Sequence, residues 1–154
     1  MPKNDLSTTQ VARILGLNYQ TFNHWICAEI ITCDVPAAGA GTHRRFTARD
    51  LTCALIARNL QRSIGFRLEP VHALLDLIRE HWLDDDPNHA GAVLAWSFKP
   101  PASGQCFPSV EALETTLIAK RHAGDAPRIW CVIDVRHSAV LAARHIQALN
   151  HRPR

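Results

Sequence analysis

Residues 9–31 read TQVARILGLNYQTFNHWICAEII, a segment that contains two helical patterns separated by a glycine. Apolar residues recur at helical spacing between Leu6 and Leu15, and a serine or threonine at positions 7–9 can cap the start. Gly16 is expected to end this helix, because glycine is favoured just past a helix C-terminus. Asn18 is a good N-cap for a second helix that runs to about position 28. The pattern predicts a helix-turn-helix.

The predicted second helix has an apolar stripe and a polar face. Phe22, Trp25 and Ile26 fall at positions i, i+3 and i+4 and are expected to face the core. Amides can pair with adenine, imidazole can donate or accept a hydrogen bond, and a phenol can reach a phosphate. The candidate DNA-contacting residues of this helix are Tyr19, Gln20, Asn23 and His24. An ordinary solvent-facing helix also carries such residues, so this face alone leaves both interpretations open.

Residues 30–46 predict a short β-hairpin, because β-prone residues precede a tip rich in proline and glycine. Its second half carries His43, Arg44 and Arg45. Adjacent guanidinium groups on a flexible hairpin can follow a groove and neutralise phosphates. Apolar residues at helical spacing then predict two further helices, over 47–62 and 69–82.

Beyond the acidic run at 84–86 the pattern changes to alternating strands and helices. Strands are predicted over 92–98 and 128–135, helices over 109–121 and 138–149, and a loop over 99–107. A boundary is therefore placed near Asp86. The expected fold class is mostly α with a small β component. It comprises a winged helix-turn-helix DNA-binding domain over 1–83 and a small α/β unit over 88–154.

Composition and charge narrow the class of protein. The 154 residues are 47% hydrophobic and 20% charged, near the globular average, which excludes disordered and fibrous classes. The sequence lacks an apolar run of about 18 residues and an N-terminal signal-peptide pattern, so a cytoplasmic protein without a membrane partner is expected. The net charge is +4 over 1–67, −4 over 68–99 and +3 over 100–154. The basic first block favours a polyanionic partner.

Metal-binding and catalytic patterns are weak. The nine histidines and five cysteines include no CxxC, HxxxH or HExxH motif, so no metal, no cofactor and reduced thiols are expected. A cluster of Cys27, Cys33 and Cys53 around the hairpin is kept as an alternative. Asp134 and His137 follow a predicted strand, where a catalytic pair or a small-ligand site is conceivable. Because no glycine-rich loop or nucleophile motif accompanies them, a helix-capping role is preferred and no enzyme is predicted.

The order of these motifs resembles the MerR-type winged helix-turn-helix family, including its excisionase-like and BldC-like relatives, over about half of the chain. The resemblance implies that Gln20, Asn23 and His24 face the major groove. It also implies that Arg44 and Arg45 approach phosphates and the edge of the minor groove. The matching residues are Val11, Ala12, Gly16, Leu17, Thr21, Phe22 and Trp25, then Gly41, His43, Arg44, Arg45 and Phe46, then Gly65, Phe66, Leu68, Val71 and Leu74.

The sequence departs from this family in two ways. Relatives often carry arginine at the positions of Gln20 and Asn23 and tyrosine at that of His24, so phosphate anchoring by the helix should be weaker and base preference different. Effector-responsive relatives also continue into a long dimerisation helix, whereas the run at 84–87 (DDDP) interrupts this chain. A coiled-coil dimer is therefore not expected. A homodimer through the C-terminal unit and cooperative monomer binding on repeated sites are the alternatives.

The leading hypothesis is a sequence-specific double-stranded DNA-binding protein, a MerR-like transcriptional regulator of bacterial type. A second hypothesis is an architectural or recombination factor of the excisionase kind. A third, from another class, is a protein-interaction adaptor whose winged helix no longer binds DNA, motivated by the arginine-poor second helix. The operator, the direction of regulation and any small-molecule effector are not encoded in these motifs.

Overall fold

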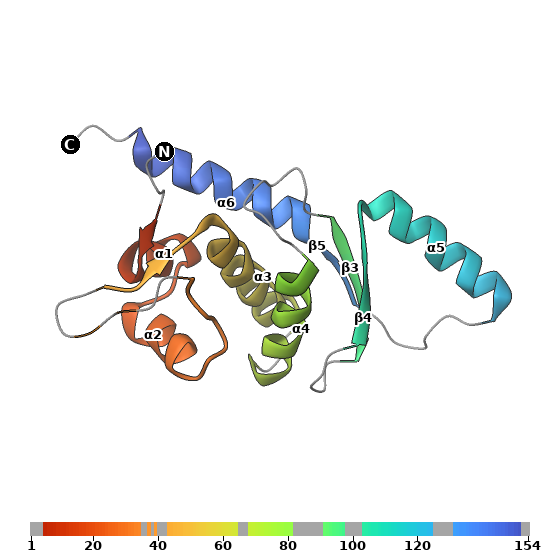
Figure 1. Ribbon diagram of the computed structural model, residues 1–154, viewed down its shortest axis with the longest axis horizontal. Coiled ribbons are helices and arrows are strands. Elements are labelled where there is room, and N and C mark those ends of the chain that lie inside the picture. The colour runs from red at the N-terminus through yellow and green to blue at the C-terminus, as the bar shows by residue number, and fades with distance from the viewer. Residues whose placement is uncertain are drawn as a thin grey trace.

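A computed structural model describes residues 5–34, 37, 39, 43–64, 68–81, 91–97, 103–124 and 131–151. These residues are mostly helical, with two small antiparallel sheets, which confirms the predicted fold class (Figure 1). The elements are β1 (Leu6–Ser7), α1 (Thr8–Leu15), α2 (Tyr19–Cys27), β2 (Arg45–Phe46), α3 (Ala48–Ile64), α4 (Leu68–His81), β3 (Ala92–Ser97), β4 (Ser103–Phe107), α5 (Val110–Ala123), β5 (Cys131–Asp134) and α6 (Val135–Asn150).

The helix-turn-helix forms as its caps predict. The Ser7 hydroxyl accepts from the Gln10 backbone N–H at 3.3 Å, and the Gln10 side chain accepts from the Ser7 backbone N–H at 2.8 Å. Gly16 ends α1 in the left-handed region at φ +64°, a conformation that disfavours other residues. The Asn18 carboxamide oxygen then accepts from the Thr21 N–H at 2.7 Å and starts α2.

The predicted hairpin over 30–46 is wrong in its strand pairing. Its second strand exists as β2, but β2 pairs with β1, in the register Leu6 with Phe46 and Ser7 with Arg45. Ile30 and Ile31 are buried in the core instead of forming a strand, because the Trp25 carbonyl accepts their N–H groups at 2.9 and 3.4 Å. The tip residues at 40–42, including Gly41, lie outside the described residues.

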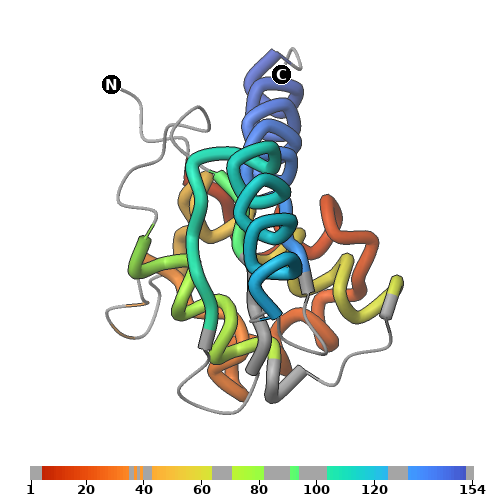
Figure 2. Tube along the Cα trace, turned by 90° about the vertical axis from the view of Figure 1, so that its right-hand side faces the viewer, coloured from red at the N-terminus to blue at the C-terminus, as the bar shows by residue number. Residues whose placement is uncertain are grey.

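The C-terminal sheet differs from the predicted arrangement. Its strand order is β4-β3-β5, and both pairings are antiparallel. β4 lies within residues 99–107, which were predicted to form a loop. The sequence of β4, SGQCF, has little apolar alternation, and its pairing partner β3 supplies the stabilisation. α5 covers one face of the sheet, where Leu113 packs against Ala92 and Phe107. In Figure 2, where the right-hand side of Figure 1 faces the viewer, α5 lies in front of the rest of the molecule.

α6 joins the C-terminal unit to the helix-turn-helix. It begins at Val135, not at the predicted Ser138, because the Asp134 carboxylate caps it by accepting from the His137 N–H at 2.8 Å. α6 packs along α3, and Ala142 and Ile146 belong to the same hydrophobic core as the residues of α1 and α2 (Figure 1). The boundary predicted near Asp86 lies outside the described residues.

Candidate DNA-binding surface

The polar face of α2 is open to solvent. Tyr19 has 54% of its surface exposed, Gln20 and His24 are also exposed, and Asn23 is partly exposed. The apolar stripe of the same helix, Phe22, Trp25 and Ile26, is buried as predicted. The buried side of α2 therefore packs into the core, and its candidate DNA-contacting side chains lie on the opposite, solvent-facing side.

Contacts between aromatic rings fix the position of α2 relative to β2. The Phe22 and Phe46 rings lie 5.6 Å apart between centroids, and Trp25 meets Phe22 edge-on at 6.4 Å. All three side chains are almost fully buried. The predicted core role of Trp25 is confirmed, and Phe46 of β2 packs against the buried side of α2.

A hydrogen bond joins the basic segment to α2. The Arg44 guanidinium Nη1 donates to the Asn23 carboxamide oxygen at 3.2 Å. The Asn23 amide nitrogen faces the Cys27 sulfur at 3.8 Å, a weak contact. His43 and Arg45, the sequence neighbours of Arg44, are exposed. Asn23 of α2 and Arg44 of the basic segment, one residue from each predicted set, thus contact each other directly, which the sequence did not indicate.

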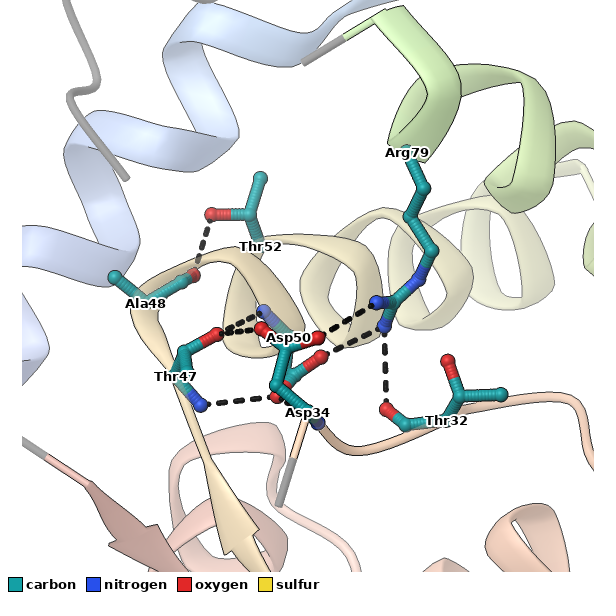
Figure 3. A network of polar contacts seen from close by, with 7 residues as sticks. All are labelled: Thr32, Asp34, Thr47, Ala48, Asp50, Thr52 and Arg79. Carbon is teal, nitrogen blue, oxygen red and sulfur yellow. Dashed lines mark hydrogen bonds and ion pairs between the residues drawn. The ribbon is translucent and has the colours of Figure 1, made fainter. Parts of the chain in front are cut away.

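The segment from Asp34 to Thr47 is here called the wing. Its first and last residues, which form the base of the wing, are both hydrogen-bonded to one carboxylate, that of Asp50. One oxygen of Asp50, Oδ2, accepts from the backbone N–H groups of both Asp34 and Thr47 at 3.0 Å (Figure 3). The Thr47 hydroxyl donates to the Asp34 carboxylate at 2.9 Å. Sequence reasoning missed Asp50, although the spacing Thr-x-x-Asp at 47–50 is a helix-start signal that could have marked it.

The cysteines do not form a recognisable metal site within the described residues. No group of three metal-ligating side chains converges there, and Cys27, Cys33, Cys53 and Cys106 are free thiols. Burial raises the pKa of the Cys53 thiol to about 11 and also raises the pKa of Cys33 and Cys106. Cys53 has no exposed surface and is a small residue of the hydrophobic core.

These environments predict an order of thiol reactivity. At about pH 8, iodoacetamide should alkylate exposed Cys27 first and Cys53 last, because a buried thiol with a raised pKa carries almost no reactive thiolate. Peptide mass mapping over time measures each rate separately. Addition of denaturant should abolish the difference. Equal rates for Cys27 and Cys53 in the native protein would contradict the burial of Cys53.

Asp134 and His137 are both exposed, and the contact between them is the capping bond from the His137 backbone, not from its imidazole. The capping role preferred from the sequence is therefore confirmed. An open cavity of about 200 Å³ lies beside them, against the C-terminal half of α3. A small-ligand site at this place stays a prediction.

A comparison with known protein families gives a match to the first half of the chain. Residues 6–78 match the family model described as MerR HTH family regulatory protein. Residues 6–78 are a MerR-type helix-turn-helix region. The match spans β1 to α4 and includes the α2 face and both ends of the wing. No curated protein matches the chain.

The MerR-type region ends at 78, so the match does not extend to β3–β5, α5 and α6. The family is one of helix-turn-helix regulatory proteins, and the matched range contains α2 and the described ends of the wing. Among the described helices, none combines the length and hydrophobicity needed to span a bilayer.

Proposed function

We propose that the chain is a sequence-specific double-stranded DNA-binding protein that regulates transcription. The observation that carries this proposal is the joining of the wing to α2 by the Arg44–Asn23 hydrogen bond, within a MerR-type region. This bond places a guanidinium group and the polar face of α2 on one continuous surface. An adaptor that had lost DNA binding would have no need to keep such groups together.

In the proposed mechanism the wing positions the protein and α2 reads the sequence. Arg45 and His43 are free to reach phosphates from the edge of the surface, where they fix orientation without specifying bases. Tyr19 at the start of α2 is placed for a backbone contact. Gln20 and His24 project from the exposed face toward base edges in the major groove.

Asn23 has a distinct part in this mechanism. Because its carboxamide oxygen already accepts from Arg44, its amide nitrogen, which has two N–H donors and makes only the weak contact to the Cys27 sulfur, is the group available to donate to a base or to a phosphate. Arg44 thus restricts which atoms of Asn23 face the groove. We infer that the pair acts as one unit in base selection.

Replacing Asn23 by alanine should therefore change base preference more than general affinity. Loss of a base contact costs about 1–3 kcal/mol at the preferred site, whereas affinity for unrelated duplexes should stay within about threefold. Fluorescence anisotropy on a preferred and a scrambled duplex measures both. Gln147→Ala is the control, because it removes an exposed amide on α6, outside the residues assigned to DNA contact, and should leave base preference unchanged. An unaltered base preference in Asn23→Ala would remove Asn23 from the readout.

Salt dependence tests the proposed DNA binding itself. Affinity for a mixed-sequence duplex is expected to fall by more than about tenfold between 50 and 200 mM salt, because contacts to phosphates release counterions. Anisotropy titrations across that range give the slope. Absence of binding at the lowest salt would favour the adaptor hypothesis.

The division into 1–83 and 88–154 belongs to the proposal as well. We propose that the second unit mediates self-association through α5, where the large apolar side chain of Ile118 exposes 58% of its surface. Sedimentation velocity of the full chain and of Ile118→Asp measures the effect. A dimer that dissociates in the variant is expected, and a monomer at all concentrations would contradict this role.

A further inference from the structure

Arg79 in the last turn of α4 reaches the base of the wing from a distant part of the chain. Its Nη2 atom donates to the Asp50 Oδ1 atom at 2.8 Å and to the Thr32 carbonyl at 3.1 Å. Its Nη1 atom lies 3.6 Å from the Asp34 Oδ1 atom. One planar guanidinium group therefore contacts residues on α3 and on the segment that enters the wing (Figure 3).

The two oxygens of Asp50 have different partners. Oδ1 accepts from Arg79, whereas Oδ2 accepts from the backbone N–H groups of Asp34 and Thr47. These two N–H groups lie at the beginning and at the end of the wing. The orientation of a single carboxylate consequently sets how both ends of the wing are held, and Arg79 fixes that orientation.

Burial makes this arrangement depend on the charge of Arg79. Asp50 has no exposed surface, and an ionised carboxylate in such a place requires a paired cation. The Arg79 side chain is itself only 14% exposed, so solvent cannot take its place readily. Removing the guanidinium would leave Asp50 without its cation and free to rotate away from the wing.

We propose that Arg79 is a positioning residue for DNA binding, which acts through Asp50 to hold the two described ends of the wing, Asp34 and Thr47, and thereby positions Arg44 and Arg45. The DNA-binding step of this inference rests on the proposed function, whereas the ordering of the wing does not. α4 also packs against β4 of the C-terminal sheet.

Hydrogen exchange tests the ordering of the wing without DNA. In Arg79→Met, exchange of the Asp34 and Thr47 amides should accelerate by at least about tenfold, while amides within α1 and α2 keep their parent rates. Methionine keeps an unbranched apolar chain in place of the arginine stem but removes the positive charge and the planar set of N–H donors. Arg144→Met on α6 is the control, because it deletes an exposed arginine away from this network. Unchanged exchange at Asp34 and Thr47, or equal acceleration throughout the protein, would overturn the inference.

DNA binding provides the second readout. The slope of log affinity against log salt concentration should become shallower in Arg79→Met. The change should correspond to the loss of about two phosphate contacts, as if Arg44 and Arg45 had both been removed. Combining Arg79→Met with alanine at Arg44 and Arg45 should produce no further fall. An additive fall would mean that Arg79 acts separately from the wing. If the parent protein does not bind DNA, the proposed function fails, but the exchange measurement still decides whether Arg79 orders the wing.

Arg79→Lys keeps the inference testable if the methionine variant does not fold. Lysine preserves the buried positive charge but presents a point charge in place of the fork, so it cannot maintain all three contacts together. The variant should fold, with accelerated exchange at Asp34 and Thr47 and a reduced salt slope. Parent-like values for both quantities in Arg79→Lys would overturn the role assigned to the guanidinium geometry.

Discussion

Replacing Phe22 by alanine should lower the free energy of unfolding by about 3–5 kcal/mol, a large part of the 5–15 kcal/mol typical of a domain. The side chain has no exposed surface and its ring packs against both Trp25 and Phe46. Truncation would leave a cavity between α2 and β2. Chemical denaturation followed by tryptophan fluorescence measures the loss.

Tyr19→Ala is the matched control, because Tyr19 is an aromatic residue of the same helix but is 54% exposed. Its unfolding free energy should stay within about 0.5 kcal/mol of the parent, while its affinity for DNA falls. Phe22→Ala should instead lose stability and DNA binding together. A stable Phe22→Ala protein would contradict the position of α2 in the core.

Alanine at both Arg44 and Arg45 should weaken binding to all duplexes by roughly 10- to 100-fold, since charge-assisted hydrogen bonds to phosphates are among the stronger polar contacts. Both residues belong to the basic segment at 43–45, and Arg44 is hydrogen-bonded to Asn23 on α2. The salt slope should become shallower by about two phosphate contacts. Anisotropy at several salt concentrations gives affinity and slope from one data set.

Alanine at Arg136 and Arg144 is the control for the loss of two positive charges. Both residues are exposed on α6, away from α2 and the wing. This control should retain the parent salt slope and lose little affinity. Equal losses in the two double variants would mean that general positive charge, and not the wing, carries the interaction.

Local chemistry explains why the helix-turn-helix was predictable. The start of α2 depends on Asn18 and the end of α1 on Gly16, and each acts within three or four residues of its own position. The apolar stripe of Phe22, Trp25 and Ile26 also follows from spacing alone. The exposed candidate residues of α2 could be predicted in the same way, because they occupy the helix positions outside that stripe.

Contacts between distant segments explain what the sequence did not reveal. β2 pairs with β1, which precedes it by about 40 residues, and no local signal selects that partner over residues 30–35. β4 likewise depends on its pairing with β3. The role of Arg79 arises only when α4 packs beside α3, since an arginine near a helix C-terminus is ordinarily interpreted as a solvated side chain.

Selection of bound fragments from a randomised duplex library, at about 50 and 200 mM salt, tests the proposed sequence-specific DNA binding most directly. We expect a recovered motif whose enrichment depends on Gln20, Asn23 and His24 and whose overall yield falls steeply with salt. Two-fold symmetry in the motif would favour a dimeric regulator, and direct repeats would favour an architectural factor. No enriched sequence at either salt concentration would contradict the proposal.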